Sequence, residues 1–217
     1  MNEVQRSRII LKILNRIYPR TPIPLKHRNK FTLLISVLLS AQTTDVNVNN
    51  VTKNIYPIHN KPEHFVKLGR KKIEKLIKSI GLFRVKAKSV YFLSKKLIEK
   101  HRGKVPNNFS DLEELPGVGH KTASVVMSQG FGHPAFPVDT HIHRLAQRWG
   151  LTNGKNVIQT EKDLKTLFPK RCWNKLHLQI IYYGREHCKA RECYGLTCKI
   201  CTTCYPNRKK PIKTKKA

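Results

Sequence analysis

Apolar residues recur every three or four positions along most of this chain, and this spacing is the strongest constraint on its fold. Near the N-terminus the repeat is formed by Ile9, Ile10, Ile13, Leu14 and Ile17, and similar repeats occur in several later segments. Such spacing places apolar side chains on one face of an α-helix. No segment shows sustained alternation with a period of two, which would mark exposed strands. The sequence therefore predicts an all-α fold.

Two of these segments carry specific expectations. Residues 31–39 are almost wholly apolar, which suits a buried central helix, although a buried strand would have the same pattern. Further along, an apolar face is formed by Ala87, Val90, Tyr91, Ser94, Leu97 and Ile98. On the other, exposed faces of that helix we expect Lys86, Lys88, Lys95, Lys96 and Lys100.

The charge of the chain indicates the class of partner. The 217 residues include 43 Lys and Arg but only 13 Asp and Glu, a formal net charge of +30. An excess of this size is typical of proteins that bind nucleic acid, although a generally lysine-rich composition also contributes. A hydrophobic fraction of 39% supports a folded core and argues against a disordered chain. Because the basic residues are scattered and no long apolar segment exists, a membrane partner is not expected.

A Gly-x-Gly turn at residues 117–119 is the first candidate for a binding site. It follows Pro116 and leads into a helical pattern from Lys121, so the turn would present free amide groups at the N-terminal end of a helix. Amide groups in this position bind phosphate oxygens, and the helix dipole adds to the attraction. On its own the turn is weak evidence, because most such turns join two packed helices without a ligand.

Four motifs in the same order resemble one family. Residues 115–123 (Leu-Pro-Gly-Val-Gly-His-Lys-Thr-Ala) resemble the helix-hairpin-helix of the endonuclease III family of DNA glycosylases. Residues 136–141 (Phe-Pro-Val-Asp-Thr-His) resemble the segment that holds the catalytic aspartate of this family. Residues 38–45 (Leu-Leu-Ser-Ala-Gln-Thr-Thr-Asp) and 80–83 (Ile-Gly-Leu-Phe) match as well. The resemblance covers nearly the whole chain.

The resemblance implies two helical domains with the active-site cleft between them. One is a six-helix barrel domain at residues 22–133, which contains the helix-hairpin-helix. The other is discontinuous, combines residues 1–21 with 134–217, and carries a cysteine-cluster loop. The basic tail from Arg208 to Lys216 is expected to be a disordered arm.

By resemblance, Lys121 and Asp139 are the catalytic residues. A lysine amine that attacks the anomeric carbon displaces the base and forms a Schiff base, from which the strand is cleaved by β-elimination. A carboxylate nearby stabilises the positive charge that develops on the sugar. Taken alone, Lys121 could be one more solvated lysine, and Asp139 could be the N-cap of the helix that follows it. Monofunctional relatives lack the lysine, so its presence favours a bifunctional glycosylase and lyase.

The resemblance also assigns contacts to DNA. A target base must leave the stack before its glycosidic bond is attacked, and Gln42 and Leu82 match the residues that fill the space it leaves. On local evidence alone, an ordinary core position for Leu82 is nearly as well supported. Where the family often has Arg, the chain has His120, so a permanent charge becomes a titratable one. The expected phosphate-binding turn consists of Gly117, Val118, Gly119 and His120.

Five of the six cysteines lie close together near the C-terminus. In a reducing compartment such a cluster indicates a metal site, whereas the sixth, Cys172, is expected to be a buried structural thiol. Two residues separate each neighbouring pair among Cys198, Cys201 and Cys204, a spacing that suits three ligands of a [4Fe–4S] cluster and would also fit zinc.

A fourth metal ligand must come from further upstream. We expect Cys188, which falls where the first ligand of the family lies, and Cys193 is the alternative. The family leaves six, two and five residues between its ligands, and this spacing is not kept here. The predicted ligands are therefore Cys188, Cys198, Cys201 and Cys204, with a [4Fe–4S] cluster as first choice and zinc as second.

These observations together predict a bifunctional DNA glycosylase and apurinic/apyrimidinic (AP) lyase of base excision repair, which removes oxidised pyrimidines. One alternative is a glycosylase of the same fold for another lesion, such as a pyrimidine dimer or a mismatch. The other is a non-catalytic helix-hairpin-helix protein that only binds DNA. We expect a monomer whose partner is double-stranded DNA with a damaged base or an abasic site.

The first residues, Met1 to Gln5, show no secretory signal. The sequence therefore predicts an intracellular protein, in the cytoplasm and nucleoid of a bacterium or in the nucleus or an organelle of a eukaryote.

Overall fold

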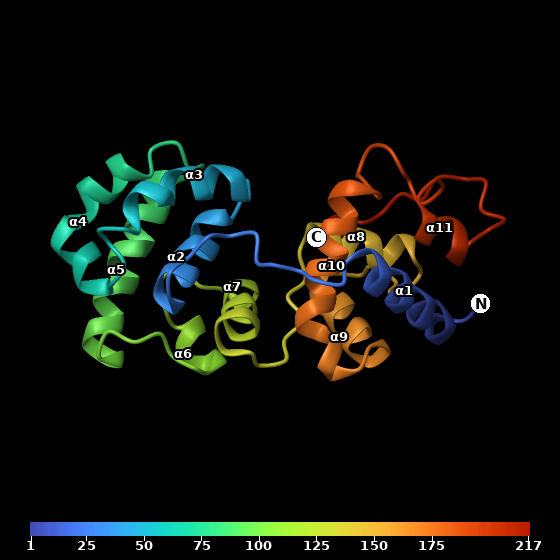
Figure 1. The fold of residues 1–217 in the computed structure, drawn as a ribbon, viewed down its shortest axis with the longest axis horizontal. Helices are drawn as coiled ribbons and strands as arrows, with labels where there is room; N and C mark the ends of the chain where they lie inside the picture. Colours follow the sequence, from blue (N-terminus) through green and yellow to red (C-terminus); the bar gives the residue numbers. More distant parts are fainter. The chain divides into compact units, whose positions relative to one another are not determined.

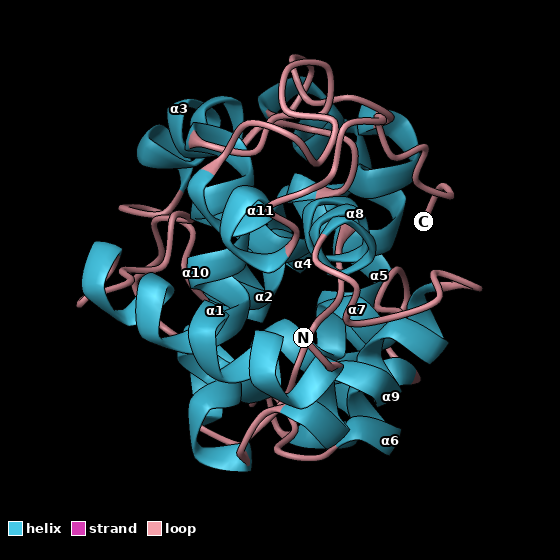
Figure 2. Cartoon of the chain, turned by 90° about the vertical axis from the view of Figure 1, so that its right-hand side faces the viewer, coloured by secondary structure: helices cyan, strands magenta, loops and turns pink.

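The structure, a computed structural model, describes all residues 1–217 and contains helices and loops but no strand (Figure 2). The predicted all-α fold is confirmed. None of the helices combines the length and the apolar character that a membrane span requires. The helices are α1 (Glu3–Ile17), α2 (Lys30–Ser40), α3 (Asp45–Ile55), α4 (Pro62–Leu76), α5 (Phe83–His101), α6 (Phe109–Glu113), α7 (His120–Val125), α8 (Thr140–Arg148), α9 (Val157–Leu167), α10 (Trp173–Glu186) and α11 (Lys199–Cys204), with a π-helical turn η1 (Val126–Gly130) and a 3₁₀ turn η2 (Lys170–Cys172).

The chain divides into two compact units. The inserted unit is Ile23–His133, and the discontinuous unit combines Met1–Pro22 with Pro134–Ala217. Each unit has a hydrophobic core of its own. In the discontinuous unit α1 (blue) packs beside α10 (orange), although they are the first and one of the last helices of the chain (Figure 1).

The central element of the inserted unit is α2. Its residues 31–39 are all buried, and it contacts α3, α5, α7 and η1, which explains why its sequence is apolar on every side. A capping box starts the helix: the side chain of Asn29 accepts from the amide of Thr32, and the hydroxyl of Thr32 accepts from the amide of Asn29. This cap, together with a length of 11 residues, gives a helix where the apolar pattern alone allowed a strand.

In the discontinuous unit, one buried amide side chain ties the end of α1 to α10. Gln179 is fully buried, and its Nε2 donates to the carbonyls of Leu14 (3.3 Å) and Tyr18 (2.9 Å). The carbonyl of Leu14 also accepts from the amide of Tyr18, the C-cap of α1, whereas the carbonyl of Tyr18 lies just beyond the helix, where no further helical residue can supply a donor. Gln179 therefore closes the end of the helix that comes from the other part of the chain.

Two expectations about charged residues are wrong. Lys86 does not lie on an exposed face of α5 but is buried. The tail beyond Arg208 is not a disordered arm, because it is hydrogen-bonded to the discontinuous unit. The guanidinium of Arg208 donates to the carbonyls of Arg148 (2.8 Å) and Gly195 (3.0 Å), and the amide of Lys215 donates to the side chain of Gln147 (2.8 Å). Cys172 also differs from expectation, since it is only half-buried.

Candidate active site and metal centre

The Gly-x-Gly turn joins α6 to α7 and packs closely against two other helices. Gly117 has a φ of 79°, which glycine adopts without the steric cost that a side chain would bring. A Cβ at this position would lie 2.7 Å from the Cβ of Ser89 on α5 and 3.1 Å from Cδ1 of Leu38 on α2. Both the backbone conformation and the available space therefore require glycine.

The turn leaves amide groups available at the start of α7. Val118 is buried and donates its amide to the carbonyl of Leu115 (3.0 Å), so it stabilises the turn itself. The amides of Gly119 and Lys121 have no acceptor within the protein. A Cβ on Gly119 would meet nothing within 4 Å, so no other part of the protein crowds the backbone at this residue. An anion can approach the backbone here.

Lys121 is the second residue of α7 and is exposed. No hydrogen bond or ion pair holds its amine, in contrast to its neighbour His120. The His120 ring lies 2.7 Å from the carboxylate of Glu113 and stacks on Phe109 with 5.7 Å between ring centroids. These contacts fix the imidazole at the edge of the hairpin and leave the lysine amine as the accessible nucleophilic group of this segment.

Asp139 is the N-cap of α8. Its backbone is extended, and its Oδ1 accepts a 2.8 Å hydrogen bond from the amide of Ile142. The capping interpretation of this residue is therefore correct in geometry. The side chain is only partly buried, and capping occupies one of its two oxygens. A carboxylate held in this way keeps one orientation and can still act on a ligand. Lys121 belongs to the inserted unit and Asp139 to the discontinuous unit.

Gln42 and Leu82, the two residues predicted to enter the duplex, share an unusual backbone conformation. Both are exposed, and both have left-handed φ angles, 55° for Gln42 and 58° for Leu82. Leu82 is 58% exposed, which excludes an ordinary core position. Their loops are neighbours, since a Cβ on Gly81 would lie 3.3 Å from the carbonyl oxygen of Gln42.

The sequence interpretation missed Lys86, whose amine lies beneath the loop that carries Gln42. One signal was available: Lys86 follows Phe83 by three residues and precedes Val90 by four, which places it on the apolar face of α5. A lysine in such a position either extends its long side chain so that the amine reaches water, or buries the amine against hydrogen-bond acceptors. Only the structure distinguishes these two arrangements.

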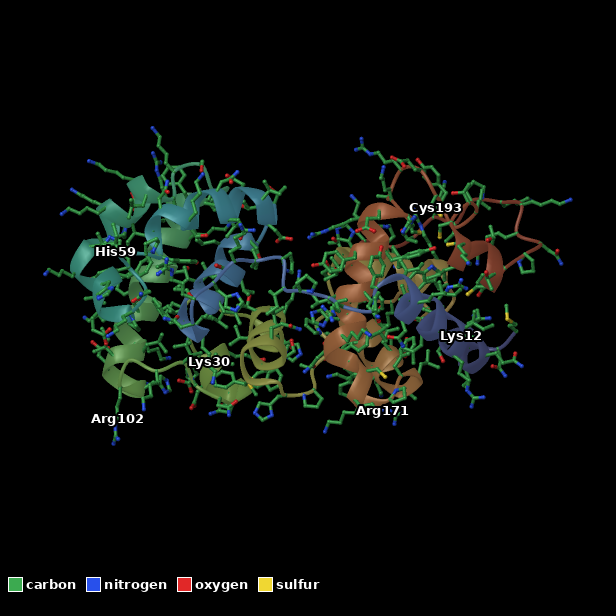
Figure 3. The ribbon with its side chains drawn as sticks, in the orientation of Figure 1. Lys12, Lys30, His59, Arg102, Arg171 and Cys193 are labelled. Carbon is green, nitrogen blue, oxygen red and sulfur yellow. The ribbon has the colours of Figure 1, made fainter.

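Four cysteine sulfurs gather where the loop that follows α10 meets the start of α11. The sulfurs of Cys188, Cys193, Cys198 and Cys201 all lie within 4.8 Å of one another, and all four residues are buried. Figure 3 labels Cys193 among the loops beside α11. This set differs from the predicted ligands at one position, because it includes Cys193 and does not include Cys204.

Local backbone geometry explains this difference. Cys198 is the N-cap of α11, and Cys201 lies in its first turn. Helical rise then carries Cys204 about 4.5 Å further along the axis, to a position where its thiol is influenced by the charges of Arg6 and Arg208. Cys193 instead turns inward, because the two residues after it have left-handed φ angles. The amide of Cys198 donates to the sulfur of Cys193 at 3.4 Å.

The electrostatics of these four thiols favour a metal. The sulfurs of Cys188 and Cys201 are 4.0 Å apart, and those of Cys193 and Cys201 are 3.9 Å apart. Hydrogen bonds from the thiols of Cys188 and Cys201 lower the pKa of Cys198, whereas hydrogen bonds to Cys188 and Cys198 raise the pKa of Cys201. Four thiolates this close repel one another strongly and can form together only around a cation.

By chemical type, the donors fit either of the two predicted groups. Four buried thiols with no oxygen ligand are the donors that a [4Fe–4S] cubane requires. Zinc remains the alternative, since tetrahedral Zn–S bonds of about 2.3 Å place sulfurs about 3.8 Å apart. The neighbouring Arg148 is buried and donates to the sulfur of Cys188 (3.3 Å) and to the carbonyl of Lys189 (2.8 Å). It therefore places a positive charge beside a thiolate and fixes the start of the cysteine loop.

Comparison with known proteins identifies the class. Residues 35–170 match the family model of the HhH-GPD superfamily base excision DNA repair proteins. The match covers more than half of the chain, which therefore belongs to this superfamily. Within it, the chain is similar to Endonuclease III of Bacillus subtilis (strain 168), with 39% identity over 98% of each protein. It is also similar to Endonuclease III of Escherichia coli (strain K12), with 42% identity over 88% of this chain and 90% of the relative.

Solved structures agree with this family. The chain superposes with a TM-score of 0.88 and 40% identity on Endonuclease III in a trapped covalent intermediate with DNA, over 92% of this chain and 94% of that one. A thermostable thymine-DNA glycosylase gives a TM-score of 0.79 with 25% identity, over 90% and 93% of the two chains. The family resemblance inferred from the four motifs is confirmed.

The cap formed by Asp139 predicts a difference between two substitutions. Asp139→Ala removes the acceptor of the Ile142 amide and should lower the free energy of unfolding by about 1 kcal/mol. Asp139→Asn keeps a capping oxygen and should stay within about 0.5 kcal/mol of the wild type. Urea unfolding followed by circular dichroism measures both. Equal destabilisation by the two variants would show that the cap contributes nothing measurable.

Proposed function

We propose that this base excision repair DNA glycosylase and AP lyase, which acts on oxidised pyrimidines, uses Lys121 as its nucleophile and Asp139 as the carboxylate that assists it. The observation that carries the proposal is the amine of Lys121, exposed and without a partner on the first turn of the hairpin helix. The free amides of Gly119 and Lys121 open at the same helix end. A phosphate bound to them would hold the adjacent deoxyribose within the reach of the lysine.

The reaction follows from the chemistry of an amine at an anomeric carbon. The neutral amine of Lys121 attacks C1′, the bond between C1′ and the base nitrogen breaks, and the base leaves with the bonding electrons and a proton. The lysine nitrogen loses one of its two protons, and the bond between C1′ and O4′ breaks as O4′ takes up a proton, which leaves a protonated imine between Nζ and C1′. Loss of a proton from C2′ then expels the 3′ phosphate and cleaves the strand. Water releases the lysine by hydrolysis of the imine.

The carboxylate of Asp139 supplies negative charge near the sugar carbon that becomes positive as the base leaves. Its carboxylate is oriented by the hydrogen bond from Ile142, so no reorganisation is required as the base departs. Its remaining oxygen can accept and return protons as the imine forms. The role as a cap and the role in catalysis are compatible, because they use different atoms of the same group.

Contacts to DNA come from the two loops and the hairpin. Gly117, Gly119 and His120 would contact phosphate, with Val118 supporting the turn from inside. The exposed side chains of Gln42 and Leu82 would enter the duplex after the damaged nucleotide has left it, which limits the cost of unstacking. The large positive charge of the chain strengthens binding to any DNA sequence.

For the cysteine loop we propose a [4Fe–4S] cluster held by Cys188, Cys193, Cys198 and Cys201, the four thiols that lie together. When bound, the cluster would crosslink the end of α10 to the start of α11. This crosslink would hold the basic residues of the loop in place against phosphates. Those residues are Lys189, Arg191 and Lys199. Cys204 would then remain a structural thiol at the end of α11.

A second candidate function differs from the first only in the lesion that is removed. The structure of a thermostable thymine-DNA glycosylase, at 25% identity, supports a glycosylase of the same fold that acts on another base. Endonuclease III is the nearer of the two in both identity and TM-score. Rates of base removal from duplexes that carry an oxidised pyrimidine, a thymine mismatch or a pyrimidine dimer separate these substrates directly.

Substitution of the nucleophile gives the sharpest test of the chemistry. With duplex DNA that contains thymine glycol or an abasic site, borohydride should reduce the imine of the wild type and leave a covalent protein–DNA adduct. Lys121→Gln should form no adduct and should bind DNA nearly as well as the wild type. The control is Lys67→Gln, which removes an exposed lysine of the same unit and should trap normally. An adduct with Lys121→Gln would exclude Lys121 as the nucleophile.

Asp139→Asn isolates the charge of the carboxylate, since asparagine keeps the helix cap. Base removal from a thymine glycol duplex under single-turnover conditions should slow by about 100-fold or more, because the developing positive charge loses its partner. Binding to the duplex should change little. A rate within a few fold of the wild type would contradict an electrostatic role for Asp139.

The ligand set predicts the metal content of two matched variants. Cys193→Ser should lose most of its iron and acid-labile sulfide and its visible absorption, whereas Cys204→Ser should keep them. Elemental analysis and the visible spectrum measure both. The opposite result would restore Cys204 as the fourth ligand, and a colourless wild type with one zinc per chain would replace iron–sulfur by zinc.

A further inference from the structure

Lys86 is a buried amine that the proposed chemistry does not use. It is 5% exposed, and its Nζ donates to the carbonyls of Leu39 (2.8 Å) and Ala41 (2.5 Å) and to the hydroxyl of Thr43 (3.1 Å). These acceptors are neutral, so the ammonium is held by dipoles alone. Burial also lowers the pKa of Lys86. An ammonium buried in this way is costly, which suggests that its position serves a purpose.

The three acceptors lie on both sides of Gln42. Leu39 is near the C-terminal end of α2, whose last carbonyls have no helical donor. Ala41 and Thr43 flank Gln42, so the amine of Lys86 fixes the chain immediately before and after this residue. The loop needs such support, because a non-glycine residue with a left-handed φ costs about 1–2 kcal/mol. Strained residues persist only where their surroundings hold them.

The backbone of Lys86 supports the second exposed residue. Its amide donates to the carbonyl of Leu82 (3.0 Å), which is the first hydrogen bond of α5. Leu82 is the N-cap of this helix, and its side chain gives the helix start no capping hydrogen bond. Lys86 thus contacts both strained segments, one through its side chain and the other through its main chain.

We propose that Lys86 is a positioning residue that holds Gln42 and Leu82 as a rigid pair for insertion into the duplex. The inference rests on the proposed role of these two residues in filling the space of the extruded nucleotide. A pair that is already in its inserted geometry loses little conformational entropy on binding, so more of the binding energy opposes restacking of the base. Without the ammonium, the carbonyls of Leu39 and Ala41 would lose their donor and the Gln42 loop would relax.

The test measures insertion without catalysis. A duplex with 2-aminopurine opposite a tetrahydrofuran abasic analogue becomes more fluorescent when side chains unstack the reporter base. The variant Lys86→Met keeps the length of the side chain and removes the charge and all three hydrogen bonds. Its control, Lys88→Met, removes an exposed lysine from the same helix. At saturating protein, Lys86→Met should give a clearly lower fluorescence plateau, whereas Lys88→Met should match the wild type.

Two further readouts separate positioning from general stability. Base removal from a thymine glycol duplex should slow about 5- to 30-fold in Lys86→Met, the factor that corresponds to the strain of one left-handed residue. Borohydride trapping on a single-stranded abasic oligonucleotide, where no stack has to be filled, should be unchanged. Combined with Leu82→Ala, Lys86→Met should add much less than it does alone, because both act at one step.

Each contrary result has a definite meaning. A plateau for Lys86→Met equal to that of Lys88→Met overturns the inference and leaves the glycosylase proposal intact. A wild type that removes the base without a fluorescence increase excludes insertion and this inference together. Where Lys86→Met does not fold, Thr43→Val removes one of the three acceptors at nearly constant shape, and an unchanged plateau for it overturns the inference as well.

Discussion

The functional part of the inserted unit depends on the close approach of one turn to two helices. Gly117 fits only because it has no side chain, since Ser89 on α5 and Leu38 on α2 occupy the space where a Cβ would lie. The same two helices carry the other candidate DNA contacts, because α2 ends at the Gln42 loop and α5 begins after Leu82. One packing contact therefore fixes the hairpin relative to both candidate insertion residues, Gln42 and Leu82.

Polar groups at helix ends carry most of the proposed chemistry. Lys121 stands at the start of α7, where its own amide and that of Gly119 have no acceptor within the protein, and Asp139 is the cap of α8. Lys86 supplies the donor that the end of α2 lacks. Helix termini suit these tasks because their amides and carbonyls have no helical partners, so a side chain or a phosphate placed there satisfies groups that would otherwise be exposed to water or unpaired.

The cysteine loop shows how far a ligand spacing can be trusted. Equal gaps of two residues made Cys198, Cys201 and Cys204 look like three consecutive ligands. The start of α11 between them changes the geometry, because helical rise moves Cys204 away while a left-handed turn after Cys193 brings that thiol inward. Sequence spacing counts residues along the chain, whereas metal binding depends on the distances between the ligand atoms in the folded protein.

The sequence by itself determined the helical fold, the family and the order of its motifs, because apolar periodicity and a glycine-dependent turn are local properties of the chain. It also placed Asp139 at a helix start and gave Lys121 its position after the turn. Only the tertiary structure decided that Lys86 is buried, that Leu82 is exposed, that Cys193 joins the other three thiols, and that the basic tail lies against the discontinuous unit. These features depend on contacts between segments far apart in sequence, and no local pattern records which carbonyl, thiol or helix face will lie opposite a given side chain.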